Sequence, residues 1–179
     1  MGKVHERIDE RLRAFIADQP MYFVATAPAE GHVNVSPKGY AGTFAVIDDH
    51  TVAYLDLTGS GAETIAHLRE NGRITVMFCS FGRTPNIVRL HGTGTVVLPG
   101  EPSWPELVGL FPETPGTRAV ITIAVERVSD SCGYGVPYME VAGDRDMLKD
   151  WAGRKSPEQL EAYRAKKNAT SIDGLPALT

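Results

Sequence analysis

Short segments with strand periodicity follow one another along the chain through tight turns, and this pattern most limits its fold. Residues 21–27 are rich in strand-forming side chains, and residues 32–36 alternate apolar and polar side chains after a turn. Residues 43–47 and 51–57 repeat the arrangement as a second hairpin. Because connections this short join antiparallel neighbours, the pattern predicts a mostly antiparallel sheet.

Three longer apolar segments continue the sheet at residues 73–81, 87–98 and 119–128. Gly92 and Gly94 interrupt the second of these segments, and glycines inside a strand are typical of bulges and barrel corners. A total of about seven strands with hairpin connections predicts a mostly β (α+β) fold, a small antiparallel barrel with peripheral helices. A Rossmann fold is disfavoured, because it would alternate strand and helix throughout.

The helical signals lie outside these strands. Apolar residues recur at helical spacing over residues 4–16, which predicts an amphipathic helix of about four turns. A short helix is predicted after Ser60, whose spacing to Glu63 fits a capping box. Further helices are expected over residues 104–111 and in the tail, where Ser156 is the cap, Pro157 the first helical residue and residues 158–167 the rest of the helix.

A length of 179 residues suits one domain. We expect that domain to span residues 1–179, with a barrel core at about 21–129 and a C-terminal helical tail at 144–179. The net charge is −4 and no segment supplies a basic face, which argues against nucleic acid as a partner.

The two cysteines, Cys79 and Cys132, are too few for a disulfide scaffold and have no metal-site spacing. The histidines are scattered, so no metal site is expected. The first residues lack the apolar run of a signal peptide, and no uncharged stretch approaches membrane-spanning length. A cytoplasmic location without a membrane partner follows by elimination.

The segment Ser36-Pro37-Lys38-Gly39 ends a predicted strand and is the first candidate binding element. A lysine at a strand end can hold a phosphate as a point charge. Gly39 would let the backbone turn or approach a ligand closely. The alternative is a plain turn with a solvated lysine.

The second candidate is the glycine-rich passage from a strand into a helix at residues 56–64. Unpaired amides and the helix dipole make such a place an anion site, and three hydroxyl side chains can add donors. The candidate ligand-binding residues here are Asp56, Thr58, Gly59, Ser60 and Thr64. In the alternative, Ser60 only caps the helix. A phosphate would also be repelled by Glu63 unless its carboxylate turned back into the capping box.

Two further elements carry chemistry that a ligand site could use. Arg89 and His91 share one face of a predicted strand, where Arg89 is a candidate second cation. The loop at residues 131–138 is rich in glycine and tyrosine and could lie over a flat ring. The alternatives are an arginine that faces solvent or a dimer interface, and a packed loop whose tyrosines fill space.

Taken in order, these segments resemble the pyridoxamine 5′-phosphate oxidase-like family of FMN-binding split barrels. The resemblance runs from Tyr22 to Val97. Two sequence segments in the tail, at residues 131–137 and 168–176, are similar to a bacterial subgroup of the same family. It is carried by Phe23-Val24-Ala25-Thr26, Asn34-Val35-Ser36-Pro37-Lys38-Gly39, Tyr54-Leu55-Asp56, Gly59-Ser60, Glu63-Thr64, Asn71-Gly72-Arg73 and Arg89-Leu90-His91-Gly92.

The resemblance implies an antiparallel split β-barrel that forms a homodimer with FMN at the subunit interface. It places Lys38, Thr58 and Ser60 at the FMN phosphate and Arg89 at the flavin side. It also implies that the segments with Ser36, Asp56, Gly59 and Thr64 hold the cofactor.

Two departures from the family pattern bear on the substrate. The oxidases carry basic residues just after the serine of the strand-to-helix turn, where this chain has Gly61-Ala62. They also end in an Arg-x-His-x-Arg type of motif, whereas this chain ends in Ala177-Leu178-Thr179. Pyridoxamine phosphate is therefore not the expected substrate.

The leading hypothesis is an FMN-dependent oxidoreductase that transfers hydride or electrons to an unidentified small molecule. The alternative is a non-catalytic binding protein for FMN, haem or a deazaflavin. A third hypothesis is a structural barrel whose glycines only shape the fold. No catalytic side chain is identified, and hydride transfer through a flavin requires none on the protein.

Overall fold

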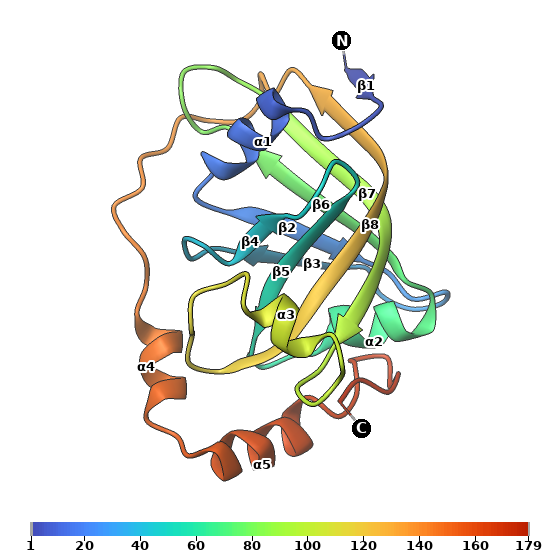
Figure 1. Ribbon diagram of the computed structural model, residues 1–179, viewed down its shortest axis with the longest axis vertical. Coiled ribbons are helices and arrows are strands. Elements are labelled where there is room, and N and C mark those ends of the chain that lie inside the picture. Colours follow the sequence, from blue (N-terminus) through green and yellow to red (C-terminus); the bar gives the residue numbers. More distant parts are fainter. Residues whose placement is uncertain (1, 179) are drawn as a thin grey trace.

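The computed structural model describes residues 2–178 and contains one strongly curled antiparallel sheet with helices around it (Figure 1). The strand order is β3-β2-β6-β7-β8-β5-β4, and β1 pairs with β8. The strands are β1 (Lys3–His5), β2 (Tyr22–Thr26), β3 (Asn34–Lys38), β4 (Phe44–Val46), β5 (Thr51–Leu57), β6 (Arg73–Cys79), β7 (Ile87–Val97) and β8 (Thr117–Ser131). The predicted fold class, an antiparallel split barrel with peripheral helices, is confirmed.

The helices lie at the edges of this sheet (Figure 1). They are α1 (Glu10–Ala17), α2 (Glu63–Glu70), α3 (Trp104–Val108), α4 (Met147–Gly153) and α5 (Pro157–Lys167). The start of α5 matches the sequence pattern, since Ser156 and Gln159 form a complete capping box there and Pro157 is the first helical residue.

The predicted N-terminal helix over residues 4–16 was wrong in its first half. Residues 3–5 form β1, which pairs with residues 128–130 of β8, and α1 begins only at Glu10 after the N-cap Asp9. The strand β5 occupies the same edge of β8 only up to Ala124, so the rest of that edge has free backbone groups that β1 can satisfy.

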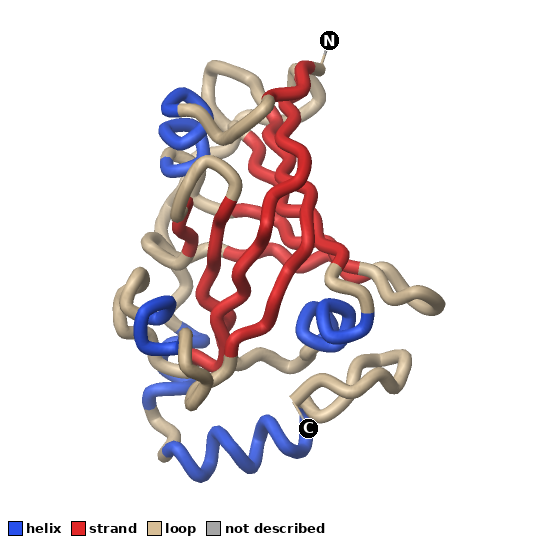
Figure 2. Tube along the Cα trace, turned by 45° about the vertical axis from the view of Figure 1, so that its right-hand side comes forward, coloured by secondary structure: helices blue, strands red, loops and turns tan. Residues whose placement is uncertain are grey.

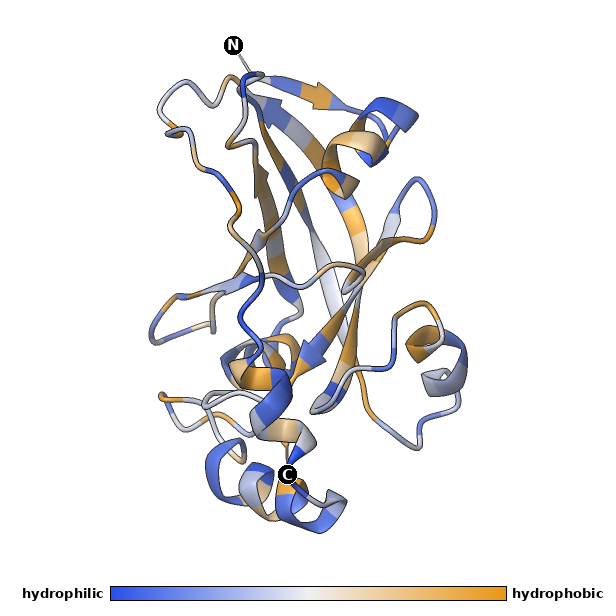
Figure 3. Ribbon diagram, turned by 90° about the vertical axis from the view of Figure 1, so that its left-hand side faces the viewer, coloured by the Kyte–Doolittle hydropathy of each residue, from blue (hydrophilic) through white to orange (hydrophobic). Residues whose placement is uncertain are grey.

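The interior of the curled sheet is the main hydrophobic core. Aliphatic side chains of α1 and α2, such as Leu12 and Ile65, close it from two ends. Tyr22, Phe44 and Phe78 form a cluster of edge-on and tilted rings with centroids 5.0–5.5 Å apart. In Figure 3 much of the hydrophobic colouring lies on the strands.

The strand β5 is buried on both faces, which explains why apolar and polar side chains do not alternate along it. Val52 and Tyr54 face the main core, while Ala53 and Leu55 pack in a second cluster with Phe111 and the helix α3. A strand covered on both sides is apolar along most of its length and does not show the alternation of a half-buried strand. Its C-terminal end, at residues 56–57, leads directly into the turn before α2.

After β8 the chain runs along the outside of the barrel to α4, and α5 then crosses beneath the strands (Figures 1 and 2). The last residues return next to α2, where Asn168 and Ala177 are fully buried. The C-terminal tail is thus packed against the end of the barrel from which α2 starts.

Candidate functional site

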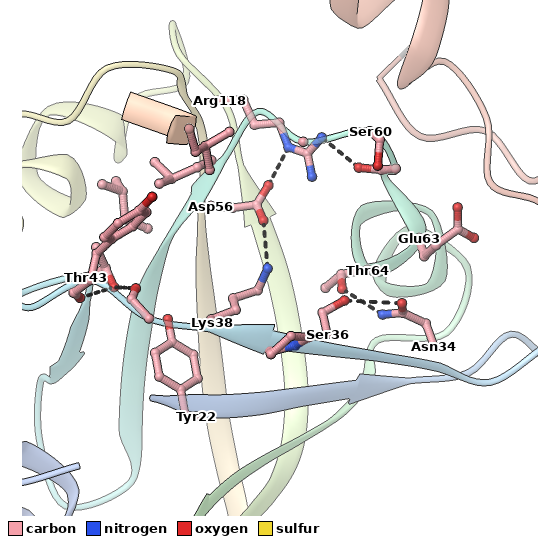
Figure 4. A pocket seen from close by; sticks show the side chains of 18 residues that line it. Tyr22, Asn34, Ser36, Lys38, Thr43, Asp56, Ser60, Glu63, Thr64 and Arg118 are labelled. Atoms are coloured by element: carbon pink, nitrogen blue, oxygen red, sulfur yellow. Dashed lines mark hydrogen bonds and ion pairs between the residues drawn. The ribbon is translucent and has the colours of Figure 1, made fainter. Parts of the chain in front are cut away.

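A pocket of about 410 Å³ opens between the end of β3, the end of β5 and the turn into α2 (Figure 4). This volume lies within the range of small-molecule sites. Its polar and charged lining comes from Tyr22, Asn34, Ser36, Lys38, Tyr40, Thr43, Asp56, Ser60, Glu63, Thr64 and Arg118. The two segments that the sequence singled out, residues 36–39 and 56–64, therefore face each other across one pocket.

At the base of the pocket, Asp56 lies between two cations (Figure 4). Its carboxylate accepts from Arg118 Nε at 2.5 Å and from Lys38 Nζ at 3.5 Å, and the side chain is 1% exposed. Burial alone would raise the pKa of Asp56, but Arg118 and Lys38 outweigh it and hold the pKa below its ordinary value. Asp56 is thus an anion that fixes both cations in place.

The position of Arg118 depends on a β-bulge. Asp56 pairs with Ala119 and Leu57 pairs with Thr117, so Arg118 is the extra residue on β8. A bulge next to a functional site re-aims a side chain. Here it turns a guanidinium from the end of an apolar strand into the pocket.

Three side chains form a hydrogen-bonded wall on the opposite side of the pocket (Figure 4). Ser36 donates to the Asn34 Oδ1 at 3.2 Å, and Asn34 Nδ2 donates to the Thr64 hydroxyl at 3.3 Å. This network connects the edge strand β3 to the first turn of α2 and holds their polar atoms at the pocket surface.

The predicted capping box at Ser60 and Glu63 was wrong. The helix α2 has Ala62 at its N-cap and no side-chain cap, while Ser60 lines the pocket. The Glu63 carboxylate accepts the Ile172 backbone N–H at 3.1 Å and points away from the pocket in Figure 4. The uncapped first turn therefore presents its amides without an acidic side chain in front of them.

The tyrosine Tyr22 adds a donor from the barrel interior. Its hydroxyl is buried and has no hydrogen-bond partner among residues 2–178, and it points up into the pocket (Figure 4). Burial raises the pKa of Tyr22 well above its ordinary value, so the hydroxyl keeps its proton. A buried donor without a partner is costly unless a ligand satisfies it.

Six of the predicted site residues line this pocket, namely Ser36, Lys38, Asp56, Gly59, Ser60 and Thr64. The structure does not bring Thr58 to the pocket, because its buried hydroxyl donates to Gly116 O and accepts from Arg164 Nε. The predicted site residue Arg89 lies away from it, where it donates to the Ser131 hydroxyl across β7 and β8. A role for Arg89 at the flavin stays a prediction.

The loop at residues 131–138 does not line the pocket either. Tyr134 and Tyr138 are about four-fifths exposed, so they neither fill space nor cover a ring in the single chain. Cys132 is exposed and Cys79 is buried.

Sequence reasoning missed Tyr22, Arg118 and Asn168 as site residues. The signal for Arg118 was a charged residue at the start of the apolar run Ala119–Val125. Asn168 begins a tail segment that carried part of the family resemblance, but nothing in the sequence indicated that it reaches Gly59.

The comparison with protein families agrees with this geometry. A family model described as pyridoxamine 5′-phosphate oxidase matches residues 8–132. The chain belongs to this family. Among curated relatives, the pyridoxamine 5′-phosphate oxidase family protein ustO of Aspergillus flavus is 42% identical over 191 residues, which cover 97% of this chain and 77% of that protein.

Solved structures show the same fold. The crystal structure of HupZ from Group A Streptococcus is 27% identical with a TM-score of 0.52, and the match covers 68% of this chain and 91% of HupZ. A FAD-binding protein from Mesorhizobium loti has a TM-score of 0.51 at 16% identity, with coverage of 73% and 96%, which shows the fold alone. The pyridoxamine 5′-phosphate oxidase-like split barrel is thus the fold of this chain.

Neither a membrane-spanning helix nor a cluster of metal-binding side chains is found within residues 2–178. None of the helices within residues 2–178 is long and apolar enough to cross a membrane. In the same part of the chain, His, Cys, Asp and Glu side chains form no group of three or more that could hold a metal ion.

Proposed function

We propose that this protein binds FMN in the pocket between β3, β5 and α2 and acts as a flavin-dependent oxidoreductase on a small molecule. The observation that carries the proposal is the uncapped start of α2, which faces two buried or half-buried cations across one pocket. Membership of the pyridoxamine 5′-phosphate oxidase family supports a flavin as the ligand.

The residues of the pocket fit an anionic, partly aromatic cofactor. Lys38 and Arg118 bring two positive charges and Asp56 brings one negative charge. The Glu63 carboxylate adds a second negative charge at the rim, but it accepts the Ile172 backbone N–H and points away from the pocket. The hydroxyls of Ser36, Ser60, Thr64 and Tyr22 supply neutral donors. When FMN is bound, it supplies the redox chemistry, and the protein supplies position and electric field.

The glycines of the turn are not required by the backbone. Neither Gly59 nor Gly61 has a positive φ, and a Cβ at Gly59 would meet no atom closer than 4.0 Å among the atoms around it. The missing side chain therefore leaves room at the pocket surface. A ligand that approaches the backbone amides of this turn would use that room.

The visible spectrum of the purified protein tests the proposal directly. We expect bound flavin, or flavin absorbance after FMN is added to apoprotein, followed by rapid reduction with NADH or NADPH and reoxidation by an acceptor. A colourless protein that takes up no FMN would refute the proposal.

Gly59→Ala should weaken FMN binding without lowering the thermal midpoint, because the added methyl contacts the ligand and not the protein.

A second candidate function is a non-catalytic binding protein for FMN, haem or a deazaflavin. Its support is that the part of the pocket lining within residues 2–178 has no histidine or cysteine that could act as an acid or base, and that Asp56 is already paired with two cations. The same lining offers haem no histidine or cysteine as an axial ligand, which favours a flavin or deazaflavin within this candidate. Stopped-flow reduction separates the two candidates, since a binding protein would stay oxidised with every pyridine-nucleotide donor. Titration of apoprotein with FMN and hemin in parallel identifies the preferred ligand.

We further propose that the protein is a homodimer and that it works in the cytoplasm. Two apolar side chains are exposed at the edge strand β3: Val33, just before the strand, is 71% exposed, and Val35, within it, is 61% exposed. Exposed apolar groups on a sheet edge are typical of protein contacts. Light scattering should give twice the chain mass, and Val35→Asp should reduce it to the monomer value.

A further inference from the structure

The turn between β5 and α2 obtains its positive charge from outside its own sequence. Residues 59–62 read Gly-Ser-Gly-Ala and contain no basic side chain. The Arg118 guanidinium reaches the turn from β8 and donates from Nη1 to the Gly61 carbonyl oxygen at 2.9 Å. Only 6% of this residue is exposed, so the charge lies beneath the turn and not in solvent.

The orientation of this guanidinium is fixed on two sides. Nε donates to Asp56, and Nη1 also donates to the Asn168 Oδ1 at 2.9 Å. The other terminal nitrogen, Nη2, makes no hydrogen bond within residues 2–178 and points into the pocket between Lys38 and Thr64 in Figure 4. One edge of Arg118 is thus held by the protein, while the other is left for a ligand.

The tail residue Asn168 ties this arginine to the turn. It is fully buried, and its Nδ2 donates to the Gly59 carbonyl oxygen at 3.1 Å while its Oδ1 accepts from Arg118. The backbone around Asn168 is itself paired, since its N–H donates to Arg164 O and its carbonyl accepts from Leu178 N. The docked tail therefore sets the distance between the guanidinium and the glycine turn.

We propose that Arg118 binds the phosphate of the cofactor and that Asn168, from the C-terminal tail, is a positioning residue for it. The pair would make the pocket select a phosphorylated flavin over the same ring system without phosphate. This inference rests on the proposed binding of FMN. The inference adds a phosphate-binding residue that lies outside the turn, and it gives the C-terminal tail a role in the site.

The test compares FMN with riboflavin, which differ only in the phosphate. Dissociation constants are measured for both with apoprotein by quenching of flavin fluorescence. We expect the wild-type protein to prefer FMN, and we expect Asn168→Ala to weaken FMN by roughly tenfold because a charge-assisted contact loses its geometry. Riboflavin affinity should change less than about twofold, since it lacks the group that Arg118 binds.

Two more variants separate positioning from general damage. Arg118→Lys keeps the charge and should retain part of the preference for FMN, whereas Arg118→Gln should abolish it. Arg164→Gln is the matched control, because Arg164 contacts Thr58 and the carbonyls of residues 116 and 117 but does not line the pocket. This control should cost stability and leave the ratio of the two affinities unchanged.

The outcomes distinguish this inference from the proposed function. If the wild-type protein binds FMN but Asn168→Ala and Arg118→Gln keep the wild-type ratio of FMN to riboflavin affinity, FMN binding stands and the assignment of Arg118 falls. Equal losses for both flavins would overturn the assignment as well, because they would show a purely structural role. If neither flavin binds the wild-type protein, the proposed function itself fails.

Discussion

The buried ion pair between Asp56 and Arg118 makes a quantitative prediction about stability. In Asp56→Asn the carboxylate is replaced by a neutral amide of almost the same size, so packing is preserved and the charge is lost. Arg118 then keeps its burial without a counter-charge, and one of the two side-chain oxygens that faced cations becomes an N–H donor. Removing one partner of a buried ion pair costs about 3–5 kcal/mol.

Such a loss is a large part of the free energy of unfolding expected for one domain, about 5–15 kcal/mol. For a chain of this length it corresponds to a fall in the thermal midpoint of roughly 6–20 °C. The assay is urea unfolding followed by tryptophan fluorescence, with scanning calorimetry for the midpoint. The matched control is Asp49→Asn, because Asp49 also contacts two arginines but its side chain is 44% exposed. We expect the control to cost about 0–1 kcal/mol.

The pH dependence of the same variant tests the cause. The pKa of Asp56 is lowered in the folded protein from its ordinary 3.8, despite the opposing effect of burial, because Arg118 and Lys38 are close. Its contribution is therefore fully present above that value and is lost as the pH falls through the lowered pKa of the folded state. The stability gap between wild type and Asp56→Asn should shrink there.

If Asp56→Asn lowers the free energy of unfolding by less than about 1 kcal/mol at neutral pH, the reasoning is refuted, since so small a loss is typical of an exposed ion pair. The reasoning is also refuted if the difference in unfolding free energy between wild type and Asp56→Asn stays constant as the pH falls below 3.8. If Asp56→Asn does not fold, Asp56→Asn combined with Arg118→Gln should recover folded protein, because the remaining unpaired cation, Lys38, is only half-buried and can reach solvent.

Two further predictions concern the barrel and its thiols. Gly92→Ala should destabilise the protein by about 1–3 kcal/mol in urea unfolding, because the added Cβ would overlap the Ala124 carbonyl at the register shift between β7 and β8, while Gly135→Ala, in open space, should stay within about 0.5 kcal/mol. Only Cys132 should react rapidly with a thiol reagent in the folded protein, since it is exposed, whereas Cys79 is buried and burial raises its pKa; two fast thiols in a spectrophotometric titration would contradict this.

The strands were predictable because their signals are local. The strand β5 occupies residues 51–57, as its strand-forming residues and the turn before it indicated, and the register shift beside Gly92 agrees with a glycine inside a long strand. The N-terminal segment was misread because apolar residues spaced four apart, such as Val4 and Ile8, suit a longer helix. That segment forms a strand because β8 has an open edge, which is a tertiary property.

The candidate site likewise has one part that local sequence predicts and one part that depends on tertiary contacts. Ser36 and Lys38 lie on one hairpin, and Ser60 follows the next one, so a short stretch of sequence contains them all. The remaining parts depend on contacts that sequence periodicity does not encode. Arg118 enters the pocket through the shifted register of β5 and β8, and Asn168 reaches Arg118 and the turn through the docking of the tail.

The distant origin of its two cations explains why the pocket has charges of both signs at its base. Lys38 and Arg118 come from separate strands and would repel each other in a dry site, so a shared counter-ion is needed to hold them together before any ligand binds. Asp56 meets that need and leaves one net positive charge, to which the uncapped amides of α2 add their dipole. A ligand phosphate would then bind a cation that is already oriented. The conformational entropy of the Arg118 side chain is lost when the tail folds and not when the ligand binds. The affinity for a phosphorylated flavin should therefore depend on residues 168–178 as strongly as on the turn that faces the ligand.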